Sequence, residues 1–278
     1  MKISMIWQRV KENALIDARF CLRGPVPPHE RIFYLVQKYI AIVTCQNSIR
    51  YLGKRLQYDN RMTPAFLLDF VDELKQVASH VDFSSVKTVF DIGANIGQYA
   101  MTLKRLYPHI VIYSFEPNHD IFEILRRNSS QVSGWHVFNF GLGDKDEDRP
   151  FFYVPGKSGQ GSCHRENATV NLGETEVVET TVRLRRLTPE CCAQFGIPRE
   201  VDFVKIDAEG FEGQAMRALT SISFRYLTLE ISSGREIGVR CEDAENLMRE
   251  IWHREPRLLC RSKIQRDELA FDATFKLC

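Results

Sequence analysis

The stretch VFDIGANIGQYAMTLKRLYPHIVIYSFEPN, residues Val89 to Asn118, decides the fold of this chain. An apolar run at Thr88–Ile92 leads into a glycine-bearing turn and a helical segment at Gln98–Leu106, and a second apolar run follows at Ile110–Phe115. A strand, a glycine turn, a helix and a second strand that ends on a carboxylate, here Glu116, usually hold a nucleotide. The sequence therefore predicts a nucleotide site and leaves open which nucleotide it takes.

Strands and helices continue to alternate toward the end of the chain. Further strands are expected at Trp135–Phe140, Val201–Ile206 and Tyr226–Ile231, and further helices at Asp120–Asn128, Glu212–Leu219 and Glu242–Trp252. Apolar strands separated by helices favour a parallel sheet that is covered on both faces. The last stretch, RLLCRSKIQRDELAFDATFKLC, predicts two strands joined by a charged turn, a hairpin that closes the sheet.

Two segments depart from this alternation. Residues 1–85 carry apolar residues at helical spacing, and Thr63–Pro64 marks the start of a second helix, TPAFLLDFVDELKQVASHV. We expect a helical extension that packs on the domain of residues 86–278 or reaches over its site. Residues 151–185 predict an inserted β-arm with a loop rich in glycine and serine, 156–162, at its tip. Such loops often act as lids.

Charge and hydropathy narrow the class of partner. The 278 residues include 37 basic and 36 acidic side chains, a formal charge of +1, which gives no global electrostatic reason to expect nucleic acid or an anionic membrane. The apolar stretch IFYLVQKYIAIVTC is broken by Gln37 and Lys38 and falls short of the ~20 residues of a membrane span. We interpret it as an amphipathic helix rather than a membrane-surface anchor. The oligomeric state is left open, with a homodimer among the alternatives.

Cysteine usage favours a reducing compartment. The eight cysteines form no C-x-x-C, and the neighbours Cys191 and Cys192 cannot easily close a relaxed bridge. This pattern is typical of reduced thiols in a cytoplasmic protein rather than of a disulfide framework or a zinc site.

The turn D-I-G-A-N-I-G distinguishes between nucleotides. Gly93 removes side-chain bulk where backbone must approach a ligand, and Gly97 lets the helix pack closely. The dinucleotide fingerprint G-x-G-x-x-G is not met because Asn95 stands at its middle position, and Asp91 at the mouth would repel a pyrophosphate. S-adenosylmethionine, which carries a sulfonium and an amino group, suits Asp91 better. The alternative is that Asp91 only caps the turn.

Two further carboxylates follow the next strands. Glu116 ends the second strand, where a carboxylate can accept both ribose hydroxyls. Asp144, in NFGLGDKDE, follows the third strand, where it could accept the exocyclic amine of an adenine. The alternatives are a surface acid at Glu116 and a simple turn at Asp144.

The segment KIDAEGFE, Lys205 to Glu212, is expected to carry the residues that take part in the reaction. Strand alternation places Lys205, Asp207 and Glu209 on one side if the strand continues. A hydroxyl that attacks a methyl group benefits from a base, and Asp207, Glu209 or His164 of the arm could serve. The alternatives are that Asp207 contacts the amino-acid part of the cofactor or a substrate hydroxyl, that Glu209 shapes the turn, and that His164 is solvated.

Glu230 and Ser162 are expected on the substrate side. Glu230 ends an apolar strand and needs a partner, so it either forms a buried pair with Lys205 or belongs to an acceptor pocket. Ser162 lies in the loop segment SGQGSCH. Asp207, Glu209 and Glu230 are oxygen ligands that could hold Mg²⁺, but nothing in their spacing requires a metal, and none is expected.

The segments FDIGANIGQYA, SFEPNHDIFEILRRN, FGLGDKDE, SGQGSCH, VDFVKIDAEGFEGQAMRAL and LTLEIS occur in this order between about residues 88 and 232. In this combination the sequence resembles the FkbM-type S-adenosylmethionine-dependent methyltransferases. The resemblance implies the class I methyltransferase fold, an α/β Rossmann-like architecture whose mostly parallel seven-stranded sheet ends in an antiparallel hairpin. It also implies O-methylation of a hydroxyl on a sugar, lipid or polyketide-like small molecule. Residue by residue, it carries cofactor binding to Asp91, Gly93, Asn95, Gly97, Glu116 and Asp144.

Two other functions compete with this one. The first is a catalytically silent module that binds a partner, and the intact turn with the paired acids Asp207 and Glu209 counts against it. The second is an RNA methyltransferase, which the even charge, the absence of a basic arm and the absence of an N-P-P-Y motif disfavour.

Overall fold

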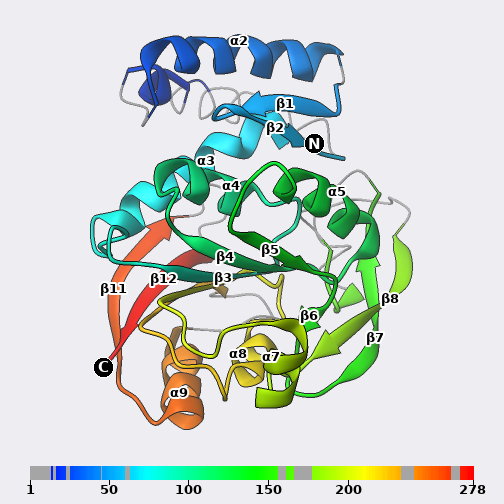
Figure 1. The fold of residues 1–278 in the computed structure, drawn as a ribbon, viewed down its shortest axis with the longest axis vertical. Coiled ribbons are helices and arrows are strands. Elements are labelled where there is room, and N and C mark those ends of the chain that lie inside the picture. Colours follow the sequence, from blue (N-terminus) through cyan, green and yellow to red (C-terminus); the bar gives the residue numbers. More distant parts are fainter. Residues whose placement is uncertain are drawn as a thin grey trace.

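A seven-stranded sheet forms the centre of the molecule in the computed structural model (Figure 1), which describes residues 14, 17–22, 26–44, 46–59, 63–155, 161–165, 177–232, 241–263 and 270–278. The strand order is β11-β12-β10-β9-β3-β4-β5. The parallel strands β3 to β5, β9 and β10 span Thr88–Ile92, Val111–Phe115, Trp135–Phe138, Phe203–Ile206 and Tyr226–Ser232. The closing strands β11 (Pro256–Lys263) and β12 (Ala270–Leu277) form an antiparallel hairpin, and β12 pairs antiparallel with β10. The fold class predicted from the sequence is confirmed.

Helices cover both faces of this sheet (Figure 1). The helices α3 (Thr63–Ala78), α4 (Gln98–Leu106) and α5 (His119–Ser129) share one hydrophobic cluster with β3 and β4. The helices α7 (Pro189–Phe195), α8 (Glu212–Ala218) and α9 (Cys241–Trp252) share a second cluster on the opposite face. Burial on both faces explains why the strands are continuous apolar runs, which made them readable in the sequence.

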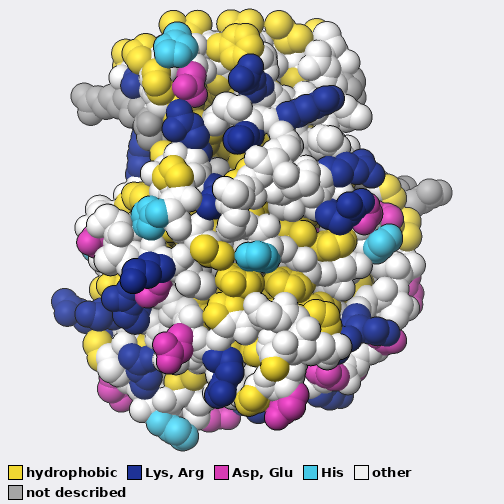
Figure 2. Space-filling view, viewed as in Figure 1, with side chains coloured by type: hydrophobic (Ala, Val, Ile, Leu, Met, Phe, Trp, Pro, Cys, Tyr) yellow, Lys and Arg dark blue, Asp and Glu magenta, His cyan; other side chains and the backbone are white. Residues whose placement is uncertain are grey.

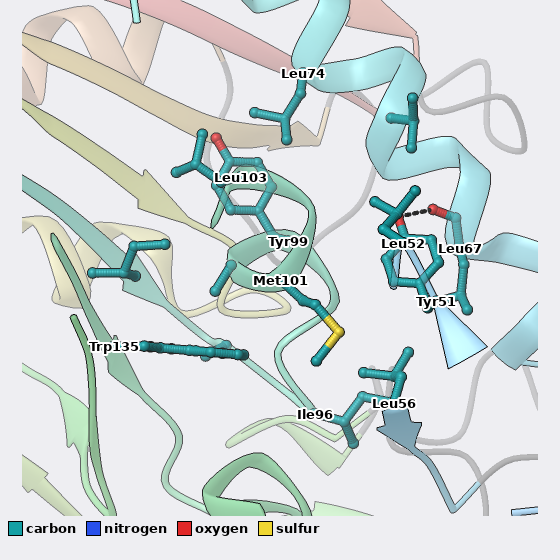
Figure 3. Close-up of a cluster of buried hydrophobic side chains, with 14 of the residues drawn as sticks. Tyr51, Leu52, Leu56, Leu67, Leu74, Ile96, Tyr99, Met101, Leu103 and Trp135 are labelled. Carbon is teal, nitrogen blue, oxygen red and sulfur yellow. Dashed lines mark hydrogen bonds between the residues drawn. The ribbon is translucent and has the colours of Figure 1, made fainter. Parts of the chain in front are cut away.

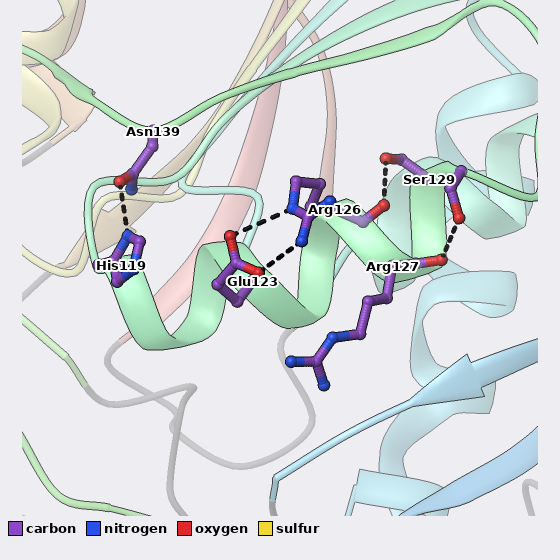
Figure 4. Close-up of polar contacts among 7 residues, drawn as sticks. His119, Glu123, Arg126, Arg127, Ser129 and Asn139 are labelled. Carbon is purple, nitrogen blue, oxygen red and sulfur yellow. Dashed lines mark hydrogen bonds and ion pairs between the residues drawn. The ribbon is translucent and has the colours of Figure 1, made fainter.

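The loop from β4 into α5 is fixed by a helix cap. The Asn118 side chain accepts hydrogen bonds from two amides of the first helical turn, which satisfies groups that the helix itself cannot pair. Figure 4 shows His119 beside Asn139, which follows β5, and Glu123 bonded to Arg126 one turn further along. The segment that carries the predicted ribose acid is thereby held between β4 and α5.

The N-terminal extension contains a β-hairpin that the sequence did not predict. After α2 (Pro28–Thr44), strands β1 (Ser48–Tyr51) and β2 (Lys54–Gln57) pair antiparallel. The turn residues Leu52 and Gly53 both have positive φ, 47° and 88°, as a tight two-residue hairpin requires. Leucine is a rare residue in that conformation, so the sequence of the turn does not predict a hairpin.

The extension packs directly onto α4 and its neighbours. Figure 3 shows Tyr51, Leu56 and Leu67 in one apolar cluster with Met101 and Trp135. The buried Tyr51 hydroxyl donates to the Leu67 carbonyl at 2.9 Å and lies 2.6 Å from the Thr102 hydroxyl of α4. Hydrophobic contact and hydrogen bonding therefore join the extension to the sheet-bearing part of the chain.

A small second sheet corresponds to the predicted arm. Strands β7 (Glu147–Tyr153) and β8 (Val178–Arg185) pair antiparallel, and β6 (Gly141–Leu142) joins β8 in parallel. β7 begins four residues before the predicted arm. Of the expected tip loop, residues 156–160 lie outside the described residues, whereas Ser162 bridges to Phe152. No helix in the described part of the chain is long and apolar enough to span a bilayer.

Candidate active site

The carboxyl ends of the parallel strands gather most of the residues singled out from the sequence. Asp91 lies in β3 beside Lys205 of β9, Glu116 directly follows β4, and Asp207 directly follows β9. Glu230 lies near the end of β10. In open α/β sheets this edge is where ligands bind.

The glycine turn after β3 leaves no room for a side chain at Gly93. Its φ is +76°, and an added Cβ would lie 1.8 Å from the carbonyl oxygen of Asp207. The amides of Gly93 and Ala94 donate to the carbonyl of Phe115 at 3.0 and 3.1 Å. These turn amides are therefore paired with β4, which argues against the alternative that Asp91 caps the turn.

The remaining two turn residues have distinct tasks. Asn95 has a φ of +52°, a conformation that asparagine tolerates better than most residues, and its side chain accepts from the amide of Ile96 at 2.7 Å. At Gly97 a Cβ would lie 2.5 Å from the ring of Trp135. The close packing expected at Gly97 is present.

Asp91 is fully buried beneath the turn. One carboxylate oxygen accepts from the Ser114 hydroxyl at 3.1 Å, and the other has no hydrogen-bond partner among the described residues. Burial raises the pKa of Asp91 to about 6, although the positive charge of Lys205 works in the opposite direction. A buried carboxylate with a spare acceptor fits a cationic ligand above it.

Glu116 is buried, so it is not a surface acid. Its two oxygens accept from the amides of Asn95 and Asn118, both at 2.9 Å. Burial raises its pKa to about 7, and these two amide hydrogen bonds only partly offset the effect. The carboxylate is held between the glycine turn and the start of α5, with lone pairs left for a ligand.

Lys205 pairs with Asp207 and not with Glu230, which corrects one of the two alternatives for Glu230. The Lys205 ammonium lies 2.9 Å from an Asp207 oxygen and 5.1 Å from the ring centre of Tyr99. Burial by itself would lower the pKa of Lys205, but nearby carboxylates, Asp207 first, outweigh it and raise the pKa above its usual value. In the strand register Thr228, not Glu230, is the neighbour of Lys205.

Glu230 faces other carboxyl groups. It is 7% exposed and lies directly opposite Asp272 of β12. Burial, followed by the charges of Glu209 and Asp207, raises its pKa well above the usual value. No ion pair joins Glu230 to a cation of the described residues, and a buried carboxyl group in such surroundings favours the pocket alternative. Within the described residues, no group of three or more His, Cys, Asp and Glu side chains is arranged to hold a metal.

The turn Asp207–Gly210, which we call the DAEG turn, is organised by a residue that the sequence reasoning missed. Glu209 and Gly210 both adopt positive φ, 47° and 95°. One carboxylate oxygen of the buried Glu212 accepts from the amides of Ala208 and Gly210. The sequence could have indicated this role, because Glu212 is an acidic residue at the first position of a helix, where a carboxylate can bind unpaired amides.

The arm is attached to this turn through Ser162. Its buried hydroxyl donates to the carbonyl of Glu209 at 2.7 Å and accepts from the amide of His164 at 3.1 Å. The ring of His164 lies 6.2 Å from that of Phe211. The structure thus brings Ser162 and His164 close to the DAEG turn, with the Ser162 hydroxyl engaged within the protein.

Asp144 lies apart from this group of buried carboxylates. It is exposed, in the connection from β6 to β7, and its charge acts on Arg217 of α8. This placement agrees with the turn alternative, and its contact with an adenine stays a prediction.

Three further polar residues lie near the buried carboxylates and Lys205, and the sequence reasoning overlooked them. We call this group of buried polar side chains the polar layer. Glu73 of α3, Tyr99 of α4 and Asp272 of β12 influence one another electrostatically. The Tyr99 hydroxyl and one Glu73 oxygen are buried without a hydrogen-bond partner in the described part of the chain. Figure 3 shows the ring of Tyr99 extending from α4 toward Leu74 of α3. The extension therefore contributes a carboxylate to the layer.

Comparison with known proteins decides the family. The Methyltransferase FkbM domain matches residues 91–255, more than half of the chain. This chain belongs to the FkbM methyltransferase family. The match starts at Asp91 and includes the glycine turn, the DAEG turn and Glu230. The family depends on S-adenosylmethionine, so the cofactor expected from the sequence is confirmed.

Relatives of this FkbM-family chain are distant. Methyltransferase 1 of Beauveria bassiana (strain ARSEF 2860) is 29% identical over 164 residues, which are 54% of this chain and 64% of that protein. Hexuronic acid methyltransferase AglP of Haloferax volcanii is 24% identical over 149 residues, 52% of this chain and 56% of that protein. The chain thus spans somewhat less than two thirds of these curated relatives. Magnesium protoporphyrin IX methyltransferase (ChlM) of Synechocystis PCC 6803 superimposes with a TM-score of 0.46 at 10% identity and 95% coverage of each chain.

Proposed function

We propose that this FkbM-family protein transfers a methyl group from S-adenosylmethionine to a hydroxyl of a sugar, lipid or polyketide-like small molecule. The observation that supports it best is the grouping of carboxylates at one sheet edge. Asp91 and Glu116 flank the glycine turn, and Asp207, Glu209 and Glu230 stand at the ends of the next two strands.

The first group suits the methyl donor. Glu116 keeps its backbone hydrogen bonds while its remaining lone pairs accept the ribose hydroxyls. Asp91 acts on the bound cation through its negative charge, because its side chain is fully buried. The cofactor supplies a methyl group on a positively charged sulfur, and a site lined by carboxylates favours that charge.

The second group suits a hydroxyl acceptor. Asp207, 36% exposed and ion-paired with Lys205, can orient the acceptor hydroxyl or take its proton. Glu209 and His164 are the other candidates for the base, and Ser162 holds the arm that carries His164 against the DAEG turn. The acceptor oxygen forms a bond to the methyl carbon as the carbon–sulfur bond breaks, and the hydroxyl proton passes to the base. The protein mainly holds the two reactants in line.

The name of one relative supports one of the proposed classes of methyl acceptor. One of them is named a hexuronic acid methyltransferase, which supports a sugar among the three classes proposed. The acceptor-side carboxylates suit hydroxyl groups, since each can accept more than one hydrogen bond.

Two measurements separate this function from its competitors. We expect S-adenosylhomocysteine to bind in isothermal titration, and D91A/E116A to lose that binding while D148A, an exposed acid on the arm, keeps it. D207N and E209Q should retain cofactor-product binding yet lose transfer of labelled methyl groups into small molecules of a cell extract. Binding without transfer by the native protein would favour the silent module, and label in RNA would favour the RNA enzyme.

A further inference from the structure

The outward face of α2 is apolar from Ile32 to Val43. Its exposed side chains are Ile32 at 57%, Phe33 at 50%, Val36 at 54%, Tyr39 at 52%, Ile40 at 47% and Val43 at 80%. We call these six residues the outer α2 face. The residues that α2 buries are Tyr34, Lys38 and Ala41. A stripe of this kind exceeds the single apolar residues normally found on a protein surface.

A buried ion pair explains why the apolar side of α2 faces outward. The ammonium group of Lys38 lies 2.6 Å from a carboxylate oxygen of Asp17, and both side chains are almost completely buried. The hydroxyl of Tyr39 donates to the other oxygen of Asp17 at 2.7 Å. Turning the helix over would break this pair and leave a buried charge, which costs more than the exposed apolar side chains. The amphipathic helix expected from the sequence is present, but its apolar face is outward, which favours the membrane-surface alternative that the sequence interpretation set aside.

Beside α2 lies a groove that carries three positive charges. Its lining includes Gln37 of α2 and the hairpin residues Arg50, Lys54 and Arg55. Lys54 donates to the carbonyl of Gln131, and Arg55 to the hydroxyl of Ser48. No carboxylate of the described chain lies within ion-pair distance of these three cations.

A cavity of about 310 Å³, lined mainly by apolar residues, adjoins the groove. Phe20, Val26, Phe33 and Leu52 are among its lining residues, and Arg50 lines both the cavity and the groove. His29 and Glu30 also line the cavity, and Glu30 is ion-paired with Arg105. Figure 2 shows hydrophobic side chains over the end of the molecule formed by α2, with Lys and Arg side chains close beneath them. Apolar surface and unneutralised positive charge therefore occur together at this end.

We propose that the outer α2 face and the adjoining cationic groove dock on the surface of an anionic lipid bilayer. The 17-residue helix, about 26 Å long, would lie in the plane of the interface with its apolar face among the acyl chains. Arg50, Lys54 and Arg55 would reach the lipid phosphates by extending their long side chains. Charge complementarity selects this occupant over a second copy, because a two-fold contact through α2 would bring two cationic grooves together. The proposal does not depend on the acceptor of the methyl group.

Vesicle flotation tests the proposal. We expect the full chain to float with phosphatidylcholine vesicles that contain about 30% phosphatidylglycerol and to bind pure phosphatidylcholine at least about fivefold more weakly, since each cation near the surface contributes about a factor of five. V36D/I40D should lose vesicle binding, and R50A/K54A/R55A should weaken it at least about tenfold on the anionic vesicles.

Matched controls use exposed residues elsewhere. V178D places one of these aspartates on an exposed valine of β8, and R257A/R261A/K276A removes three exposed cations from β11 and β12; both should bind vesicles like the native chain. Failure of the native protein to bind anionic vesicles would overturn the proposal, as would binding that survives V36D/I40D. Concentration-dependent dimerisation in light scattering without vesicle binding would overturn it in favour of a second copy.

Discussion

At Gly93 the backbone leaves space for a hydrogen atom only. Its φ of +76° already disfavours a side chain, and an added Cβ would lie 1.8 Å from the Asp207 carbonyl oxygen. No side-chain rotation can relieve this clash, because the opposing atom belongs to the backbone. We expect G93A to separate β3 from β9 at the turn and to lower the affinity for S-adenosylhomocysteine at least about tenfold, or 1.4 kcal/mol. Isothermal titration measures the affinity.

Gly196 provides the control for this substitution. It has a similar φ, +65°, at the end of α7, and no atom lies within 4 Å of its added Cβ. G196A should therefore destabilise the fold by about 1–2 kcal/mol through backbone strain alone and leave the affinity unchanged. Equal loss of affinity in G93A and G196A would show that general destabilisation, not the turn, causes the effect.

Glu116 should make stability and binding depend on pH. Its pKa is about 7 in the folded protein and about 4.3 in the unfolded chain. Between these values the folded state binds more protons, so the free energy of unfolding falls as pH rises from about 4 to 7. Ribose hydroxyls prefer the ionised carboxylate, so the affinity for S-adenosylhomocysteine should rise over the upper part of the same range.

The variant E116Q isolates this contribution. Asp91 has a pKa of about 6 and the pKa of Glu230 is also raised, so the contribution of Glu116 is the difference in slope between the native protein and E116Q. Chemical denaturation and titration calorimetry at about pH 6 and 7.5 should show a steeper slope for the native protein than for E116Q. An unchanged slope in E116Q would assign the dependence to another group.

Among the elements, the small sheet of β6, β7 and β8 is linked to the candidate active site through the bridged residue Ser162. The hydroxyl of Ser162 bonds the carbonyl of Glu209 in a buried position. S162A should cost about 1 kcal/mol and free the arm from the DAEG turn, so limited proteolysis should cleave within residues 147–185 faster than in the native protein. S130A removes a comparable hydroxyl bond at the exposed end of α5 and should leave this cleavage rate unchanged. Equal cleavage rates in S162A and the native chain would mean that other contacts hold the arm.

Elements with a regular hydrophobic period were predictable from the sequence, and special backbone conformations were not. β3 and α4 have the predicted ends, and β9 and β5 differ by two residues. The β1–β2 hairpin was missed because Leu52 adopts a conformation that leucine rarely takes. The partner of Lys205 was left open because a lone sequence gives no register between β9 and β10, and the register places Thr228 beside it.

For the whole molecule, the turn and strand-end acids were visible in local sequence, while the residues that surround them were not. In the sequence Glu73 is one of several polar residues in a helix with apolar residues at helical spacing, and Asp272 is one polar residue in the last strand, so nothing local distinguishes either. Only the packing of α3 and β12 against the parallel strands brings both near Lys205. The same packing makes the extension part of the fold and not an appended segment.

Unfolding should therefore involve the extension and the sheet together. One hydrophobic cluster runs from Phe20 through Leu67 to Trp135, and the buried hydroxyl of Tyr51 links Leu67 with Thr102. Calorimetry should show a single transition. Y51F should lower the free energy of unfolding of that transition by about 1–3 kcal/mol, because it removes the buried hydrogen bonds of the Tyr51 hydroxyl to Leu67 and Thr102. Y113F, at a half-buried tyrosine of β4, should shift it by less. If the extension melted in a separate early transition, and only that transition moved in Y51F, the two parts would be independent folding units.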